Sequence, residues 1–187
     1  MTDQRTFRVT TDELRETIPQ MNIGDRVFLT GTIYTARDQA HMALFRMLDA
    51  GEKLPFEIRD AVIYYAGPTP GKGDMPTGAC GPTTSGRMDG FAPRLLDLGL
   101  AAMIGKGKRS DEVIDSMVKN GAVYLCAVGG AGALLARSIK TMEEIAFPEL
   151  GCESVKRMTV EDMPLIVGID CRGNDIYKEG LKKYARI

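Results

Sequence analysis

Two periods of hydrophobic and polar residues alternate along this chain, one typical of β-strands and the other of α-helices. β-Branched and aromatic residues gather in five short stretches, which we predict as strands at residues 26–34, 61–66, 100–104, 122–128 and 163–170. Helices are predicted at residues 12–17, 38–50, 87–98, 111–119 and 133–140, and Ser110 is a good N-cap for the fourth. The second helix has apolar residues at helical spacing, namely Ala40, Ala43, Leu44, Met47 and Leu48.

This succession of strands and helices favours an α/β fold with substantial parallel pairing in its sheet. We expect one domain over residues 1–187 with short terminal extensions, because this length suits one core and no internal repeat is visible. Residues 67–86 interrupt the pattern with six glycines, four prolines and no hydrophobic period. Loops of this length in compact domains are usually functional or disordered.

The charge and the cysteine content of the chain argue against several classes of ligand and partner. Twenty-four basic and 25 acidic residues leave a net charge of −1, so no general affinity for nucleic acid or for an anionic membrane is expected. Cys80, Cys126, Cys152 and Cys171 are scattered without a C-x-x-C spacing, and His41 is the only histidine. A metal site built wholly by this chain is therefore not expected. No leader or membrane-spanning run is visible, so we expect a cytoplasmic protein.

Residues 31–41 (GTIYTARDQAH) place an arginine and a histidine where a predicted strand gives way to a helix. Ligands tend to bind at the carboxyl ends of strands in open α/β sheets. The four-residue gap would bring Arg37 and His41 near one face if the helix begins early enough. The alternative is a solvated arginine and a histidine that caps the helix. Spacing alone leaves both interpretations of Arg37 open and favours capping for His41.

Residues 81–89 (GPTTSGRMD) bring three hydroxyls and small residues to the start of a predicted helix. Backbone N–H groups and the hydroxyls of Thr83, Thr84 and Ser85 can converge there on an anion. Arg87 adds a fork of donors suited to a carboxylate or phosphate. An arginine in the first helical turn is unfavourable towards the helix dipole, which indicates that an anion belongs there. Simple N-capping explains one hydroxyl but not the cluster, so we predict an anion site.

Two glycine-rich turns follow later strands. Residues 105–108 (GKGK) resemble a phosphate-binding turn, although the spacing of a P-loop is missing, and a solvated turn is the simpler interpretation. Residues 129–132 (GGAG) follow a strand and open a helix, as a dinucleotide fingerprint would, but Leu135 stands where the third glycine is required. Close packing of the helix on its strand explains these glycines better. The cations and hydroxyls together suit a small polyanion, and only His41 ordinarily titrates near neutral pH.

The chain contains, in order, the segments GTIYTARDQAH, YYAGPTPG, GPTTSGRMDGF, MIGKGKRS and AVGGAGALLA. Over about residues 24–177 it resembles the C-terminal part of one-chain class I iron–sulfur fumarases and L-tartrate dehydratases, or the separate beta subunit of two-chain ones. GPTTSGRMD is the specific element. The resemblance implies a single swivelling β/β/α domain with a mixed, partly parallel sheet. This domain would close over a [4Fe–4S] cluster whose three cysteine ligands belong to the alpha subunit, so no metal ligand is expected in this chain.

The resemblance also implies roles for individual residues. Thr83 corresponds to the base that removes the proton alpha to a carboxylate. A threonine hydroxyl is far too weak a base alone, so a carboxylate of the partner would have to activate it. Lys108 is an alternative to Lys106 as the basic contact, and His41 and Asp38 would support the site. Substrate binding is assigned to four residues, Arg37, Thr84, Arg87 and Lys106.

The function implied by the resemblance is reversible hydration of fumarate to L-malate, a reaction of the tricarboxylic acid cycle. The chain would act as a beta subunit in a hetero-oligomer with its cluster-bearing alpha subunit, and whether it also forms a homodimer stays open. One iron of the cluster would act as a Lewis acid on the dicarboxylate. The alternatives are an L-tartrate dehydratase that makes oxaloacetate, an enzyme for a methylated relative of these substrates, and a non-catalytic anion-binding module.

Overall fold

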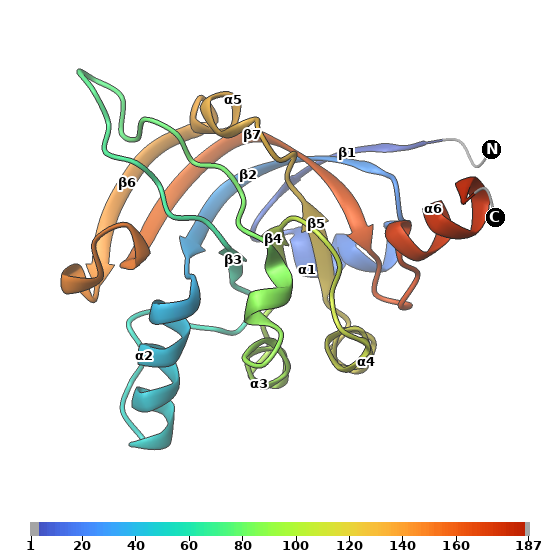
Figure 1. Ribbon diagram of the computed structural model, residues 1–187, viewed down its shortest axis with the longest axis horizontal. Helices are drawn as coiled ribbons and strands as arrows, with labels where there is room; N and C mark the ends of the chain where they lie inside the picture. The colour runs from blue at the N-terminus through green and yellow to red at the C-terminus, as the bar shows by residue number, and fades with distance from the viewer. Residues whose placement is uncertain (1–3, 186–187) are drawn as a thin grey trace.

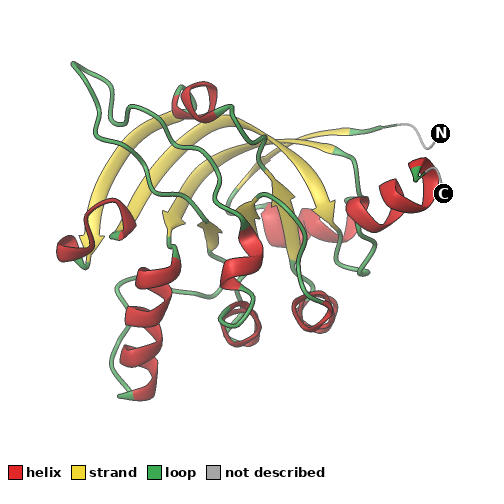
Figure 2. Ribbon diagram, viewed as in Figure 1, coloured by secondary structure: helices red, strands yellow, loops and turns green. Residues whose placement is uncertain are grey.

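The computed structural model describes residues 4–185, which form one mixed sheet of seven strands with helices against it (Figures 1 and 2). The α/β fold class predicted from the sequence is thus confirmed. The first five strands run parallel to one another. The strands are β1 (Thr6–Thr10), β2 (Arg26–Thr35), β3 (Val62–Tyr64), β4 (Ala102–Gly105), β5 (Val123–Cys126), β6 (Ile139–Ala146) and β7 (Val155–Ile169).

The helices are short, and among those of the described residues none is long and apolar enough to cross a membrane. The α-helices are α1 (Leu14–Thr17), α2 (Asp38–Asp49), α3 (Ala92–Asp97), α4 (Asp111–Asn120), α5 (Gly132–Ala136) and α6 (Ile176–Tyr184). Three segments form 3₁₀ helices, η1 (Ile18–Gln20), η2 (Ser85–Met88) and η3 (Pro148–Glu153).

The long strands β2 and β7 close the sheet into a ring. The strand order is β1-β2-β3-β4-β5-β7-β6, with an additional antiparallel pairing between β2 and β7. The pairs β2–β3, β3–β4 and β4–β5 are parallel, whereas β7 runs antiparallel to β5, β2 and β6. The ring β2-β3-β4-β5-β7 therefore has a parallel wall and an antiparallel wall, and α2, α3 and α4 lie outside the parallel wall (Figure 1).

Alternating side chains of the parallel strands supply two separate cores. Val62, Ile104 and Leu125 face the antiparallel wall and pack with residues of β2 and β7 such as Leu29 and Val160. The intervening residues face the helices and pack with α2, α3 and α4; they include Ile63, Tyr65, Met103 and Tyr124. A central strand buried on both faces reads as a continuous apolar run, as residues 61–66 and 100–104 do.

Several predicted boundaries agree closely with the structure. β2 and α2 begin at the predicted residues, and α4 begins at Asp111 with the Ser110 hydroxyl accepting a hydrogen bond from Val113 N. Gly121 ends α4 in the left-handed region, at a φ of 62°. This conformation favours glycine because it lacks a Cβ atom.

Other predictions were wrong. The helix predicted at 133–140 is only the five-residue α5, and the chain is already in β6 from Ile139. The helix predicted at 87–98 is two pieces, η2 and α3, with a turn at Asp89–Phe91 between them. The last strand begins at Val155 and not at 163, because its first half alternates between a buried face and a solvated face. β1, β6 and α6 were not predicted, since solvent covers much of each of them.

Gly105 at the end of β4 is packed so closely that the fold requires a glycine there. A Cβ atom at this position would lie 1.9 Å from the Ser85 Oγ and 3.1 Å from the Tyr65 ring. Any side chain would therefore displace Ser85 from its place against the strand.

We expect Gly105→Ala to lower the free energy of unfolding by about 1–3 kcal/mol, because overpacking a buried position costs about that amount. Urea denaturation followed by circular dichroism measures the change. Gly180→Ala is the matched control, since a Cβ atom at Gly180 in α6 meets nothing within 4 Å. Alanine should raise helix stability there by about 0.5–1 kcal/mol. Equal stability of the wild type and Gly105→Ala would contradict this account of the packing.

Candidate functional site

The carboxyl ends of the parallel strands meet at one edge of the sheet, and the predicted site residues follow these ends. Arg37 comes two residues after β2, and Lys106 follows β4 directly. The loop that carries Thr83 returns to the end of β3, where Ala66 pairs with Pro82. The structure therefore brings segments from residues 31–41, 81–89 and 105–108 to one edge, as the carboxyl-end rule predicts.

Thr83 is inserted between β3 and β4 where these strands separate. Its N–H donates to the Tyr65 carbonyl at 2.7 Å, and its own carbonyl accepts from Lys106 N at 3.3 Å. Ser85 N then donates to the Lys106 carbonyl at 2.9 Å, and Thr84 forms a parallel bridge with Lys106. These hydrogen bonds fix Thr83, Thr84 and Lys106 side by side through their main chains. Thr83 is partly exposed and Thr84 is exposed.

The buried hydroxyls of Ser85 and Tyr124 connect the loop that carries Thr83 to the turn after β4. The Tyr124 hydroxyl donates to the Gly107 carbonyl at 3.0 Å and lies 2.9 Å from the Ser85 Oγ. Tyrosine has one hydroxyl hydrogen, so Ser85 donates to Tyr124 in this arrangement. Ser85 is fully buried and consequently serves the loop and not a ligand.

Arg87 is held by Asp38, the first residue of α2. Its Nε donates to Asp38 Oδ1 at 2.9 Å, and its Nη2 lies 2.9 Å from Oδ2. The side chain of Arg87 is 52% exposed, which leaves part of the guanidinium available to an anion. The dipole argument from the sequence does not hold, because η2 is a single 3₁₀ turn and the carboxylate of Asp38 already accompanies the arginine. The accessible position of Arg87 at the edge still suits anion binding.

Arg37 lies between the loop after β3 and η3. Its Nη2 is 3.4 Å from Glu153 Oε1, and its Nη1 would lie 2.8 Å from a Cβ atom on Gly67. The buried Nε has no hydrogen-bond partner within residues 4–185. Glu153 also accepts from Gln39 N at 2.9 Å, which ties η3 to the start of α2. Sequence spacing gave no indication of Glu153, which is 116 residues away from Arg37.

His41 is fully buried behind Arg37. Its Nδ1 lies 2.8 Å from the Arg37 carbonyl, and its ring contacts the rings of Tyr65 and Phe91. A carbonyl oxygen can only accept, so Nδ1 carries the proton. Burial lowers the pKa of His41 to about 4, although the bond to the Arg37 carbonyl acts in the opposite direction. His41 is therefore neutral at pH 7 and holds the main chain at Arg37 through the carbonyl, while α2 itself has no side-chain cap.

Lys106 reaches along the glycine-rich turn after β5. A Cβ atom on Gly129 would lie 3.4 Å from Lys106 Cδ and 3.7 Å from its Nζ. Lys106 is partly buried, whereas Lys108 is exposed. The structure thus gives Lys106 the defined position at the edge. Gly132 packs against Gly81, with a Cβ atom there only 3.1 Å from Gly81 N, so close packing does explain part of the GGAG turn.

A buried ion pair behind the edge was missed by sequence reasoning. The Arg109 Nε donates to Asp89 Oδ1 at 2.7 Å, and Ser110 N donates to Asp89 Oδ2 at 2.7 Å. The Arg109 side chain is 0% exposed, and its guanidinium lies over the rings of Tyr65 and Tyr124. Removing one partner of such a pair leaves a buried charge uncompensated. Both residues belong to segments that carry the family resemblance, Asp89 to GPTTSGRMDGF and Arg109 to MIGKGKRS, but nothing in the sequence paired them.

The edge supplies cations and hydroxyls, while groups suited to metal binding or proton abstraction at neutral pH are lacking. Among residues 4–185, no three His, Cys, Asp or Glu side chains gather in a way that could hold a metal ion. All four cysteines are free, and burial raises the pKa of Cys80 to about 12. Burial also raises the pKa values of Tyr65 and Tyr124. The described residues thus do not fit a cluster, whereas their cations and hydroxyls are groups suited to an anion.

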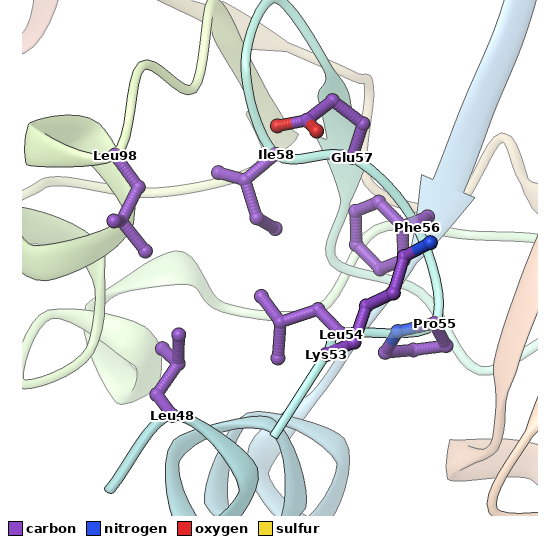
Figure 3. Close-up of a pocket in the computed structure, with 8 residues that line it drawn as sticks. All are labelled: Leu48, Lys53, Leu54, Pro55, Phe56, Glu57, Ile58 and Leu98. Atoms are coloured by element: carbon purple, nitrogen blue, oxygen red, sulfur yellow. The ribbon is translucent and has the colours of Figure 1, made fainter. Parts of the chain in front are cut away.

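A separate hollow of about 490 Å³ lies at the opposite end of β3 (Figure 3). Leu48, Leu54, Ile58 and Leu98 face one another across it. It lies beside the chain that enters β3, whereas the anion-binding residues follow the ends of the strands. This hollow is therefore distinct from the candidate site.

Comparisons with known proteins indicate the same family as the resemblance does. The family model described as "Fumarase C-terminus" matches residues 1–180. The chain is 42% identical over 173 residues to the anaerobic class I fumarate hydratase of Escherichia coli, covering 91% of this chain and 32% of that protein. It is also 42% identical to fumarate hydratase 2 of Leishmania major, of which it covers 30%. The chain thus spans about a third of the length of these fumarate hydratases.

A second kind of relative is similar in length to this chain. A Methanocaldococcus jannaschii protein that carries the provisional name L(+)-tartrate dehydratase subunit beta is 41% identical over 175 residues. The match covers 90% of both chains. This domain therefore has relatives both as a part of longer fumarate hydratases and as a chain of its own size.

The buried neutral state of His41 predicts a pH-dependent stability. Its folded pKa of about 4 lies below the ordinary value of 6.5, so the unfolded chain binds the extra proton as pH falls from 6.5 towards 4. We expect the wild type to lose about 1–2 kcal/mol of unfolding free energy between pH 7 and pH 5 through this group. Since the chain has one histidine, His41→Gln should remove that part of the slope. Urea denaturation at both pH values measures it, and identical slopes for the two proteins would contradict the assignment.

Proposed function

The chain belongs to the fumarase C-terminal family, and from that premise we propose that it is the dicarboxylate-binding beta subunit of a [4Fe–4S] hydro-lyase. The reaction proposed is the reversible hydration of fumarate to L-malate. This activity would place the enzyme in the tricarboxylic acid cycle of the cytoplasm.

The observation that carries this proposal is the insertion of Thr83 between β3 and β4. It brings the main chain of Thr83 beside that of Lys106, which pairs with the same loop. Arg87 follows four residues later on that loop, and Arg37 lies at the end of the neighbouring strand β2. One edge thus offers three cations to a ligand with two carboxylates. Guanidinium groups suit this task because they can bind a carboxylate through two parallel hydrogen bonds.

These residues would bind and orient the substrate. We assign Arg37, Arg87 and Lys106 to the two carboxylates of the dicarboxylate, with the Thr84 hydroxyl as a further donor. Held in one geometry, the substrate presents the carbon alpha to a carboxylate to Thr83. Correct placement of this kind accounts for a large part of many enzymatic rate enhancements. The closed edge would also exclude bulk water from the reacting carbons.

Thr83 would receive the proton from that carbon at its Oγ1 in the dehydration direction. Its hydroxyl must first transfer its own proton to a stronger base, because a free threonine hydroxyl is far too weak to act alone. No described residue at the edge is free to do this: His41 is buried and neutral, Asp38 is engaged by Arg87, and Glu153 is engaged by Arg37. We therefore propose that the partner subunit contributes the activating carboxylate.

His41 and Asp38 would act through the arginines without touching the substrate. His41 donates to the Arg37 carbonyl, and Asp38 accepts from Arg87. Each thereby limits the positions that a substrate-binding arginine can take. This gives the two residues a positioning role.

The cluster would be ligated by the alpha subunit. When bound, it would supply a Lewis-acidic iron to the substrate. The absence of a metal-binding group among residues 4–185 of this chain supports this division of labour. The share of the fumarate hydratases that this chain does not match, about two thirds of their length, leaves room for a cluster-bearing part.

An L-tartrate dehydratase beta subunit is the second candidate. The named subunit from M. jannaschii, which matches this chain over 90% of both lengths, favours it. Tartrate carries two carboxylates as fumarate does, and the same three cations would bind it. A non-catalytic anion-binding module would use these residues too, and turnover separates it from both enzymes.

Anaerobic coexpression and purification of this chain with its cluster-bearing partner tests the proposal. We expect the purified pair to hydrate fumarate and the isolated chain to be inactive, because the isolated chain lacks the cluster and the activating base. Tartrate dehydration measured in parallel distinguishes the second candidate. A pair that turns over neither substrate would contradict both enzyme proposals.

Within that pair we expect Arg87→Ala to lower turnover of the dicarboxylate at least 100-fold, since a charged contact to the substrate is typically worth about 3 kcal/mol or more. The free energy of unfolding should change by no more than about 1 kcal/mol, because the ion pair with Asp38 is half exposed. Arg94→Ala is the matched control, since Arg94 of α3 makes a similar exposed ion pair with Asp49 of α2. Near-normal turnover of a folded Arg87→Ala pair would exclude the assigned role.

A further inference from the structure

The turn that carries Lys106 is held from its far side by the C-terminal helix α6. Gly107 N donates to the Tyr177 hydroxyl at 3.0 Å, across 70 residues of sequence. We propose that Tyr177 is a positioning residue for Lys106 and thereby sets the affinity of the site for a dicarboxylate. This inference rests on the proposed function, because it assumes that Lys106 binds the substrate.

The backbone of the turn has two kinds of support. On the side of β3, Lys106 N donates to the Thr83 carbonyl and the Lys106 carbonyl accepts from Ser85 N. On the other side, the Gly107 carbonyl accepts from the Tyr124 hydroxyl, and Tyr177 takes the N–H of the same glycine. Gly107 has a φ of 84°, where the chain turns sharply away from the strand direction. Tyr177 therefore holds the peptide group that immediately follows Lys106.

Tyr177 itself occupies a defined place. Asp175 is buried and is the N-cap residue of α6. Its side chain accepts a hydrogen bond from Tyr177 N at 2.8 Å. Ile169 at the end of β7 forms a bridge with Asp175, which ties this cap to the sheet. The tyrosine hydroxyl also lies 3.6 Å from Cys126 Sγ at the end of β5. Contacts with the sheet thus position the Tyr177 hydroxyl, which in turn holds the turn at Gly107.

The space beside Lys106 shows why this contact bears on binding. A cavity of about 350 Å³ adjoins the lysine and is bordered by Val128 and Gly129 on one side and by Ile176 and Tyr177 on the other. The lysine stem runs along Gly129, where the absence of a Cβ atom leaves room for it. With the Gly107 hydrogen bond removed, the turn can relax towards this cavity. The ammonium group would then spend less time at the site edge.

A purely structural role for Tyr177 makes a different prediction. If the hydroxyl only anchors α6, its loss lowers stability and leaves substrate affinity unchanged. If it positions Lys106, its loss weakens binding of the dicarboxylate while the fold persists. α6 has no buried residue of its own, so loosening the helix should affect the core little.

Tyr177→Phe in the purified pair separates the two roles, with Tyr184→Phe as the matched control. Tyr184 lies on the same helix and is 71% exposed, so its variant removes the same atom without touching the turn. We expect Tyr177→Phe to raise KM for the dicarboxylate about fivefold and to change kcat less than twofold, since one hydrogen bond is worth about 1 kcal/mol. The melting temperature should stay close to that of the control. Unchanged KM in a folded Tyr177→Phe pair would overturn the proposal.

Amide hydrogen exchange in the isolated chain supplies a readout that does not depend on turnover. The Gly107 N–H should exchange several-fold faster in Tyr177→Phe than in the wild type and in Tyr184→Phe. Equal exchange rates in all three proteins would overturn the positioning role, whatever the activity of the pair. The wild-type pair could turn over neither fumarate nor tartrate while exchange at Gly107 changes as expected. In that case the proposed function fails, and the substrate-affinity part of this inference fails with it. The hydrogen bond from the turn to Tyr177 would still be supported.

Discussion

The separation of β3 and β4 at their carboxyl ends is the feature on which the candidate site depends. The strands pair through residues 62–64 and 102–104, and beyond that point the main chain of Thr83 takes the place of direct pairing. Two backbone hydrogen bonds thereby satisfy polar groups that would otherwise be unpaired between two buried strands. The same two bonds bring the main chains of Thr83 and Lys106 together. The insertion of Thr83 thus both completes the backbone hydrogen bonding of these strands and brings two candidate site residues together.

The rest of the fold keeps this edge rigid. The pairing of β2 with β7 closes the ring behind the parallel strands, and both faces of those strands are buried in separate cores. Two carboxylates form ion pairs with the arginines of this edge, Asp38 with Arg87 and Glu153 with Arg37. Such groups are costly to bury unless they are paired, so each is tied to a partner. The site that we propose is thus an anion-binding edge with no free base among the described residues.

Sequence patterns predicted those parts of this design that depend on local periodicity. β2 and α4 were predicted because their apolar residues and caps are clear. Arg37, Thr83 and Lys106 were grouped as cations and hydroxyls suited to a small polyanion, and the family resemblance gave them their roles. β6 and α6 were missed because solvent covers much of their surface and their apolar period is weak. The helix predicted at 87–98 wrongly continued through the turn at Gly90. Glu153, Arg109 and Tyr177 contribute through contacts between residues far apart in sequence, which no local pattern encodes.

The central claim is that this chain binds a dicarboxylate at the carboxyl edge of its parallel strands and depends on another chain for the rest of the site. A crystal structure of the anaerobically purified pair with bound L-malate tests it most directly. The account predicts the malate carboxylates within hydrogen-bond distance of Arg37, Arg87 and Lys106, with the Thr83 hydroxyl facing the carbon that loses its proton and a carboxylate of the partner behind it. Malate bound away from this edge, or a partner docked on the opposite end of the sheet, would contradict the account.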